Sequence, residues 1–125
     1  MEEIKVGDFI RNKEGYIGKI EKIIYDDLEK QNYYSCEKHN VMASGYIEQI
    51  VAHSPNLIDL IQCGDYVNGY RILEKTKTKN NQMQICILKD NNSSNWRTIN
   101  NETLKSIVTK EMYKLVEYIV GGNNE

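Results

Sequence analysis

Proline is almost absent from this sequence, and several other residue types are scarce. Its 125 residues include one proline (Pro55), one tryptophan, one phenylalanine, two histidines and three cysteines. The cysteines (Cys36, Cys63 and Cys86) are odd in number and form no C-x-x-C pair, which argues against a disulfide framework and indicates a reducing compartment. We expect Cys63 and Cys86 to fill the core.

The scarcity of reactive residues excludes most catalytic constellations. Cys36 and His39 form a C-x-x-H that His53 could join, but no matching second pair completes a structural zinc site. A nucleophilic Ser or Cys needs a His and an orienting acid, and no G-x-S-x-G turn is present. A phosphate-binding loop and a dinucleotide fingerprint are also missing. We therefore expect no enzymatic activity, no metal and no cofactor.

No run of 18 apolar residues occurs, and the first residues, MEEIKVGD, are acidic. This pattern predicts neither a transmembrane helix nor a signal peptide, so we expect a cytoplasmic location and no membrane partner. The formal net charge of −2 disfavours binding to bare duplex nucleic acid, although it leaves room for a local basic face.

One seven-residue pattern occurs twice. IKVGDFI at residues 4–10 and IQCGDYV at residues 61–67 share Gly-Asp-aromatic with aliphatic flanks, at an offset of 57 residues. The same offset pairs Ile50 and Val51 with Ile107 and Val108 without a gap. Two independent matches at one offset predict a duplicated module.

Within each copy the apolar residues favour strands. The segments 5–12, 15–27 and 33–39 are rich in β-branched and aromatic residues, as are 66–75, 82–89, 95–99 and 103–110. Asn68-Gly69 is the strongest short hairpin signal. Residues 20–28 also suit helical spacing, which leaves a helix there as an alternative. Helical turns are expected at 54–60, with Ser54 as cap and Pro55 as first helical residue, and at 110–115.

The sequence therefore predicts a mainly β protein of two tandem small β-barrels with short helical turns. The first module spans residues 1–60 and the second 61–125, and modules of this size should pack together. An aspartate on the aliphatic side of a strand needs partners, so we expect the carboxylates of Asp8 and Asp65 to accept backbone N–H groups from a neighbouring turn. The preceding glycines would permit a bulge or close approach. A catalytic carboxylate pair is the alternative.

Nine tyrosines and one tryptophan are many for so small a chain. Rings that a barrel cannot bury would lie beside cations, as in recognition surfaces. The candidates for binding are Trp96, Arg97, Tyr33, Tyr34, Tyr70, Arg71, Tyr16 and Arg11. The alternative for each tyrosine is an ordinary strand residue with a packed ring and a solvated hydroxyl.

The segment VGDFIRNKEGYIGKI resembles the KOW motif, a glycine-punctuated hairpin of Src-homology-like barrels in ribosomal proteins and transcription elongation factors. Gly7, Gly15 and Gly18 match its glycines, and Ile10 and Ile20 its aliphatic positions. The resemblance implies two Src-homology-like barrels and a module that binds RNA or the transcription or translation machinery through its loop. The second copy, GDYVNGYRIL, lacks the longer loop and the second inner glycine.

The whole chain, including DYVNGYRI and SIVTKEMYKLVEYIV, also resembles small uncharacterised proteins of temperate phages and prophages of low-GC Gram-positive bacteria. This resemblance implies a phage accessory protein that binds a host protein or ribonucleoprotein stoichiometrically. Counter-defence is the expected role, as an anti-CRISPR-like inhibitor or a scavenger of a nucleotide signal. RNA or a nucleotide is the alternative ligand. Because small modules bury little surface alone, a homodimer is also expected.

Overall fold

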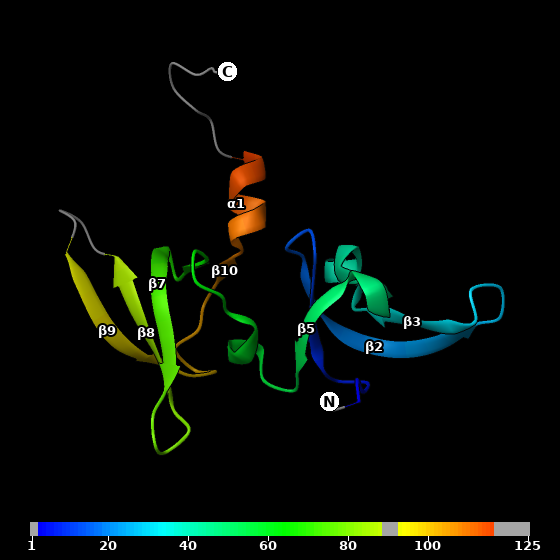
Figure 1. Ribbon diagram of the computed structural model, residues 1–125, viewed down its shortest axis with the longest axis horizontal. Helices are drawn as coiled ribbons and strands as arrows, with labels where there is room; N and C mark the ends of the chain where they lie inside the picture. Colours follow the sequence, from blue (N-terminus) through cyan, green and yellow to red (C-terminus); the bar gives the residue numbers. More distant parts are fainter. Residues whose placement is uncertain (1–2, 89–92, 117–125) are drawn as a thin grey trace.

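The computed structural model describes residues 3–88 and 93–116 of the chain (Figure 1). Up to Leu60, the first half contains β1 (Phe9–Asn12), β2 (Ile17–Asp26), β3 (Gln31–Cys36), β4 (Gly45–Tyr46) and β5 (Ile50–Ser54), with 3₁₀ turns η1 (Lys38–Ala43), η2 (Ile47–Gln49) and η3 (Leu57–Leu60). The second half, from Ile61, contains β6 (Tyr66–Val67), β7 (Tyr70–Lys77), β8 (Met83–Leu88), β9 (Ser94–Ile99), β10 (Ile107–Val108) and helix α1 (Lys110–Val116).

The strands form two five-stranded antiparallel sheets with the same topology. The first has the order β4-β3-β2-β1-β5, and the second has β9-β8-β7-β6-β10 when read in the same sense. In each, four strands follow one another and the fifth returns to pair with the first. The mainly β prediction is confirmed. In the described residues, however, the outer strands of a sheet do not pair with each other, so neither sheet is closed.

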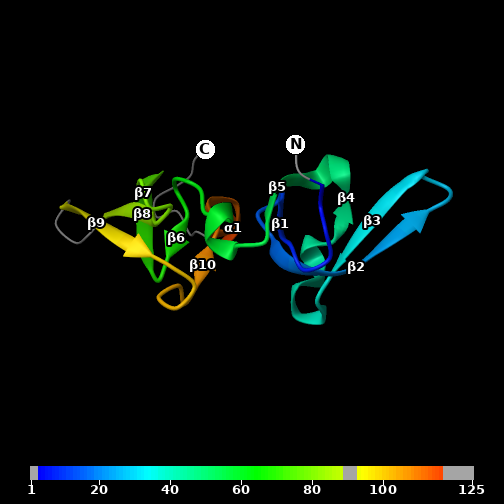
Figure 2. The same ribbon diagram turned by 90° about the horizontal axis from the view of Figure 1, so that it is seen from below.

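Figures 1 and 2 place the two sheets side by side, with the connection through η3 between them. The first sheet lies within residues 9–54 and the second within 66–108. The division into modules at residue 60 stays a prediction.

The Gly-Asp corner of the first half is a tight turn, and β1 starts only after it. Gly7 has a φ of +96°, and the Asp8 amide donates to the Lys5 carbonyl at 3.0 Å. The Asp8 carboxylate accepts the Lys5 amide at 3.1 Å and closes the turn from the other side. Gly7 N–H donates to the Ile20 carbonyl at 2.9 Å, and the Ile20 amide donates to the Asp8 carbonyl at 2.8 Å. The positive φ is why glycine stands here.

The second half repeats this corner contact by contact. Gly64 also has a φ of +96°, and the Asp65 amide donates to the Gln62 carbonyl at 3.1 Å. The Asp65 carboxylate accepts the Gln62 amide at 2.7 Å. Gly64 N–H donates to the Ile72 carbonyl, and the Ile72 amide donates to the Asp65 carbonyl, each at 2.8 Å. Both aspartates accept backbone N–H groups as expected, but from the turn in which they stand; only Asp65 also accepts an amide from another segment, that of Lys110.

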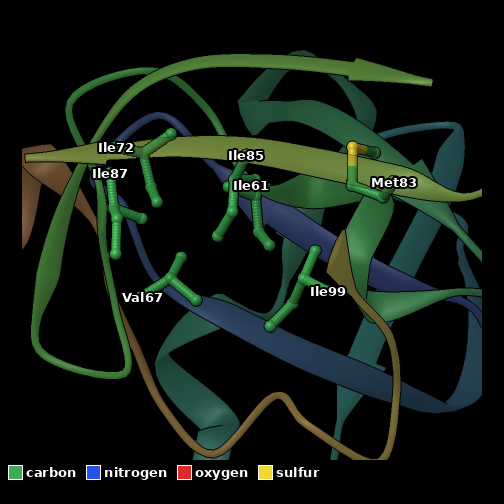
Figure 3. Close-up of a cluster of buried hydrophobic side chains, with 7 residues drawn as sticks. All are labelled: Ile61, Val67, Ile72, Met83, Ile85, Ile87 and Ile99. Atoms are coloured by element: carbon green, nitrogen blue, oxygen red, sulfur yellow. The ribbon is translucent and has the colours of Figure 1, made fainter. Parts of the chain in front are cut away.

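Each sheet covers its own apolar core. The second core comprises Ile61, Val67, Ile72, Met83, Ile85, Ile87 and Ile99 (Figure 3). The first comprises Ile4, Ile10, Ile20, Tyr34, Cys36 and Ala43. Burying an isoleucine side chain stabilises the folded state by roughly 1.5–3 kcal/mol, so these alternating isoleucines are what hold each sheet in register.

Local structure agrees with most of the predicted turns. Asn68 and Gly69 have φ values of +53° and +88°, which is the two-residue type I′ hairpin that Asn-Gly predicts. The alternative helix over residues 20–28 is wrong, because β2 occupies most of it. The turn predicted at 54–60 is present but starts at Leu57, after its cap Asn56, so Pro55 precedes it. The turn predicted at 110–115 is confirmed as α1.

One core assignment is wrong. Cys63 is exposed, whereas Cys86 is buried as predicted. The reason lies in the corner: Cys63 and its counterpart Val6, which is 59% exposed, precede the glycine within the turn and point away from the sheet.

Candidate functional site

The structure separates the eight predicted recognition residues into three groups. Arg11 and Tyr34 are buried. Tyr16 and Tyr33 are half-buried on the first half. The remaining four, Tyr70, Arg71, Trp96 and Arg97, are exposed on the second sheet. A surface that combines all eight does not exist, and only the third group gathers aromatic rings and cations.

Arg11 joins the two halves instead of facing solvent. Its side chain is fully buried, with 0% exposed. Nη1 and Nη2 donate to the two carboxylate oxygens of Asp65 at 2.5 and 2.9 Å, a bidentate pair. Nη1 also donates to the Leu60 carbonyl at 2.9 Å, and Nη2 to Glu111 Oε1 at 2.7 Å. Arg11 is therefore removed from the recognition surface.

The Asp65 carboxylate is saturated by donors. Besides Arg11 it accepts the Gln62 amide at 2.7 Å and the Lys110 amide at 2.9 Å. Burial alone lowers the pKa of Arg11, but its hydrogen bonds and ion pairs with Asp65 and Glu111 outweigh burial and raise that pKa above its ordinary value. The guanidinium of Arg11 is therefore held in its charged form inside the protein, where its bonds to Asp65 and Glu111 position the halves.

The loop between β1 and β2 packs on the second half. Gly15 has a φ of +93°, and its carbonyl accepts Thr109 Oγ1 at 2.7 Å. A Cβ on Gly15 would collide with the side chains of Thr109 and Glu111. This is the loop that the KOW resemblance marks as a contact element, and here its tip contacts the other half of the same chain.

Sequence reasoning missed Thr109 and Glu111 altogether. At the offset of 57, Thr109 corresponds to Ala52 and Glu111 to Ser54, while Arg11 corresponds to Asn68. The junction residues are therefore not repeated between the halves. The same is true of Glu14, which corresponds to the exposed Arg71, so a difference between the copies does not by itself identify the junction.

The exposed group lies on β7 and β9 of the second sheet. The guanidinium of Arg97 stands over the Tyr70 ring, 5.6 Å from its centroid. Tyr70 is 40% exposed and Trp96 48% exposed. Arg97 is opposite the core residue Ile85 and Trp96 is opposite Cys86, so these neighbours project from opposite faces of β9. Tyr70 and Arg97 therefore share one face of the sheet, and Trp96 lies on the other. We use the name aromatic-basic surface for the four exposed residues Tyr70, Arg71, Trp96 and Arg97, which together occupy both faces of this part of the sheet.

The tyrosines of the first half form a different arrangement. The rings of Tyr33 and Tyr46 meet edge to face at 5.2 Å, and Tyr46 donates its hydroxyl to Asp26 at 2.7 Å. This bond raises the pKa of Tyr46 to about 12 and lowers the pKa of Asp26. Tyr16 packs against the first core. These rings stabilise the first sheet.

Two hollows test whether a small ligand fits. A cleft of ≈ 260 Å³ between the halves is lined by Phe9, Lys19, Leu57 and Lys105, among others. It is smaller than the roughly 300–1,000 Å³ of typical ligand pockets. A groove of ≈ 440 Å³ on the first half is lined by Tyr34 and mostly aliphatic residues, and neither Lys nor Arg reaches it. Neither hollow combines the size and the cations that a nucleotide requires.

Within residues 3–88 and 93–116, no group of three or more His, Cys, Asp and Glu side chains is arranged to hold a metal ion. Cys36, His39 and His53 are therefore not brought together as a site. Over the same part of the chain, no helix is long and apolar enough to cross a membrane.

Comparison with protein-family models, curated proteins and solved structures gave no match to this chain.

Proposed function

We propose that this chain is a non-enzymatic binding protein that blocks a host factor stoichiometrically and serves a phage in counter-defence. We further propose that its two sheets are tandem Src-homology-like barrels, because each has four consecutive strands and a fifth that returns to the first after a 3₁₀ turn or loop. The observation that carries the binding role is the aromatic-basic surface, which combines exposed aromatic rings with two arginines on one sheet.

The composition of that surface suits a protein partner. Trp, Tyr and Arg dominate the energetics of protein interfaces, because they bury large areas and still offer hydrogen bonds. The contact between Arg97 and Tyr70 holds both side chains in one arrangement before binding, which lowers the entropy lost on association. The junction at Arg11 supports the surface further by fixing the second half to the first.

The repeated acids speak for binding over catalysis. The Asp65 carboxylate accepts four hydrogen bonds, from Arg11 and from two backbone amides, and has no oxygen left for proton transfer. The Asp8 carboxylate accepts the Lys5 amide and lies 3.5 Å from His53 Nδ1. Both aspartates thus hold backbone turns in place. The choice of a host immune factor as the partner rests on the resemblance to phage proteins.

Binding of RNA through a KOW-like loop receives less support. The loop of the first half is packed at Thr109, the corresponding hairpin of the second half has only Asn68 and Gly69 at its turn, and the net charge is −2. Binding of RNA would still show itself by an affinity that falls steeply with salt concentration, because counterions are released from phosphates.

Affinity capture from host lysate, with and without nuclease, tests the proposal. We expect the tagged wild-type chain to retain a protein or ribonucleoprotein and to relieve an immune system in cells. The variant Tyr70→Ala/Arg97→Ala should lose both, whereas Tyr25→Ala, at a 59% exposed tyrosine of β2, should keep both. Capture of neither a macromolecule nor a nucleotide, together with no relief of immunity, would refute the proposal.

A further inference from the structure

β9 is a long and regular edge strand of the second sheet. It pairs with β8 in unbroken register from Met83↔Ile99 to Leu88↔Ser94. Among the described residues no strand pairs with its other side, and Figures 1 and 2 show it at the outer end of the second sheet. Of the other edge strands, β4 and β10 have two residues each, and β5, which has five, pairs with β1 through a register shift.

The sequence of β9 contains none of the residues that usually prevent an edge strand from pairing with another chain. Soluble proteins protect edge strands with lysine, proline, bulges or shortness, because unpaired N–H and C=O groups recruit another strand. Residues 94–99 contain no proline, lysine or acid, and Arg97 is their one charge. The residues from Ser94 to Thr98 are all exposed. The edge therefore has the features of a strand that is covered by a partner.

We propose that the partner is a second copy of this chain, paired antiparallel along β9 about a two-fold axis at Trp96. Residues directly opposite in an antiparallel pair lie on the same face. A two-fold axis perpendicular to the sheet preserves the faces, so some residue of β9 must stand opposite itself. The candidates for that residue near the middle of the strand are Asn95, Trp96 and Arg97.

The side chains select among these registers. An axis at Arg97 would place two guanidinium groups opposite each other, which is destabilising. An axis at Asn95 would pair only residues 94–96 of β9 with the same segment of the second copy. An axis at Trp96 pairs the two indoles and places Arg97 opposite the second copy's Asn95 and Thr98 opposite its Ser94. All five contacts of this register are complementary, since an aromatic pair meets on one face and arginine meets an amide oxygen on the other.

The dimer would join the second sheets of two copies into one continuous sheet. It would cover the exposed indole of Trp96 and bring two Tyr70 rings to the same side of that sheet. This inference goes beyond the proposed function, because it concerns the association of the purified chain with itself. The dimer and the proposed host partner would both use Trp96 and Arg97, so binding of a host factor should compete with dimerisation. The test uses purified protein alone, and its failure would leave the proposed function standing. An edge of this length buries less than a standard interface of about 1,600 Å², so the association should be weak and concentration-dependent.

Sedimentation velocity of the purified chain tests the dimer. From micromolar to millimolar concentration, the mass should rise from the 14.6 kDa of one chain toward twice that value. Trp96→Lys should stay monomeric throughout, because it opposes two ammonium groups at the axis while lysine is well tolerated on a free edge. Leu28→Lys is the matched control: Leu28 is 93% exposed on the β2–β3 hairpin, and its replacement should leave the dimer intact.

Charge changes at Asn95 test the register independently of Trp96. Asn95→Asp should tighten the dimer about 3- to 10-fold, because each copy gains an ion pair with the other copy's Arg97. Asn95→Arg should weaken it by a similar factor, and Asn95→Arg/Arg97→Asp should restore it. A wild-type chain that stays at one chain mass up to millimolar concentration would overturn the proposal. So would a dimer that Leu28→Lys disrupts and Trp96→Lys does not, or one indifferent to the charge at Asn95.

Discussion

Replacing Arg11 with methionine should destabilise the protein far more than replacing any exposed arginine. Methionine matches the aliphatic stem of arginine in length but donates no hydrogen bond. The change leaves the Asp65 carboxylate, 0% exposed, without the two guanidinium bonds of 2.5 and 2.9 Å, and it removes the donors of Leu60 O and Glu111. Two backbone amides, of Gln62 and Lys110, are what remains for Asp65.

The expected loss follows from the uncompensated charge. Removing one partner of a buried ion pair typically costs about 3–5 kcal/mol, because the remaining charge stays desolvated. Natural domains are stable by roughly 5–15 kcal/mol, so this variant would lose a large share of the total. Arg71→Met, at an exposed position of β7, is the matched control and should change the free energy of unfolding by less than about 0.5 kcal/mol.

Equilibrium unfolding in urea, followed by circular dichroism and by Trp96 fluorescence, is the appropriate assay. A double-mutant cycle with Asp65→Asn should give a coupling energy of about 1–3 kcal/mol between residues 11 and 65. Because the pair joins the halves, the two probes should separate into two transitions in Arg11→Met and coincide in the wild type. A loss below about 1 kcal/mol for Arg11→Met, as for a surface ion pair, would refute the account of the junction.

Three further substitutions give distinct outcomes in the same assays. Gly7→Ala should lower the free energy of unfolding by about 1–2 kcal/mol for its positive φ alone, since no atom lies within 4 Å of the added Cβ. Gly15→Ala should lower it by about 1–3 kcal/mol more, because its Cβ would collide with Thr109 and Glu111 of the other half. Equal losses for the two variants would contradict the packing of the β1–β2 loop on the second half. Asp26→Asn should bring the pKa of Tyr46 down from about 12 in an ultraviolet titration, and an unchanged titration would refute their hydrogen bond. In the wild type, the contribution of Asp26 to stability is complete above pH 3.8 and is lost as pH falls through its lowered pKa, so Asp26→Asn should flatten the acid limb of the stability curve.

Most strands were predictable because they depend on short-range signals. Ile85 and Ile87 alternate in β8, and Asn68-Gly69 fixes the hairpin between β6 and β7. The strands β4 and β5 were not predicted, because neither segment carries a clear alternation or a hairpin signal. The open edges of the sheets were not predictable. Closure depends on whether the outer strands reach each other across the core, and strand length and curvature are not encoded in periodicity.

The candidate site was predicted in part for a similar reason. Tyr70, Trp96 and Arg97 were selected by residue type, and all three are exposed in the structure, as a binding residue must be. Arg11 was selected on the same ground and is buried, because its partners Asp65 and Glu111 are distant in sequence and no local pattern announces them. A single charged residue in a strand gives the same sequence pattern whether its side chain faces water or packs against the other half of the chain.

The junction distinguishes two halves that share one sheet topology. Its contact is head to tail: Arg11 of the first half meets Asp65 and Glu111 of the second. The second half carries Asn68 where the first has Arg11, and the first half carries Ser54 where the second has Glu111. The side chains that make this contact are therefore not offered a second time on the remaining surfaces of the two halves. Association between copies must then use a different surface, and β9, which lies at the outer end of the second sheet, is an edge that the junction leaves uncovered.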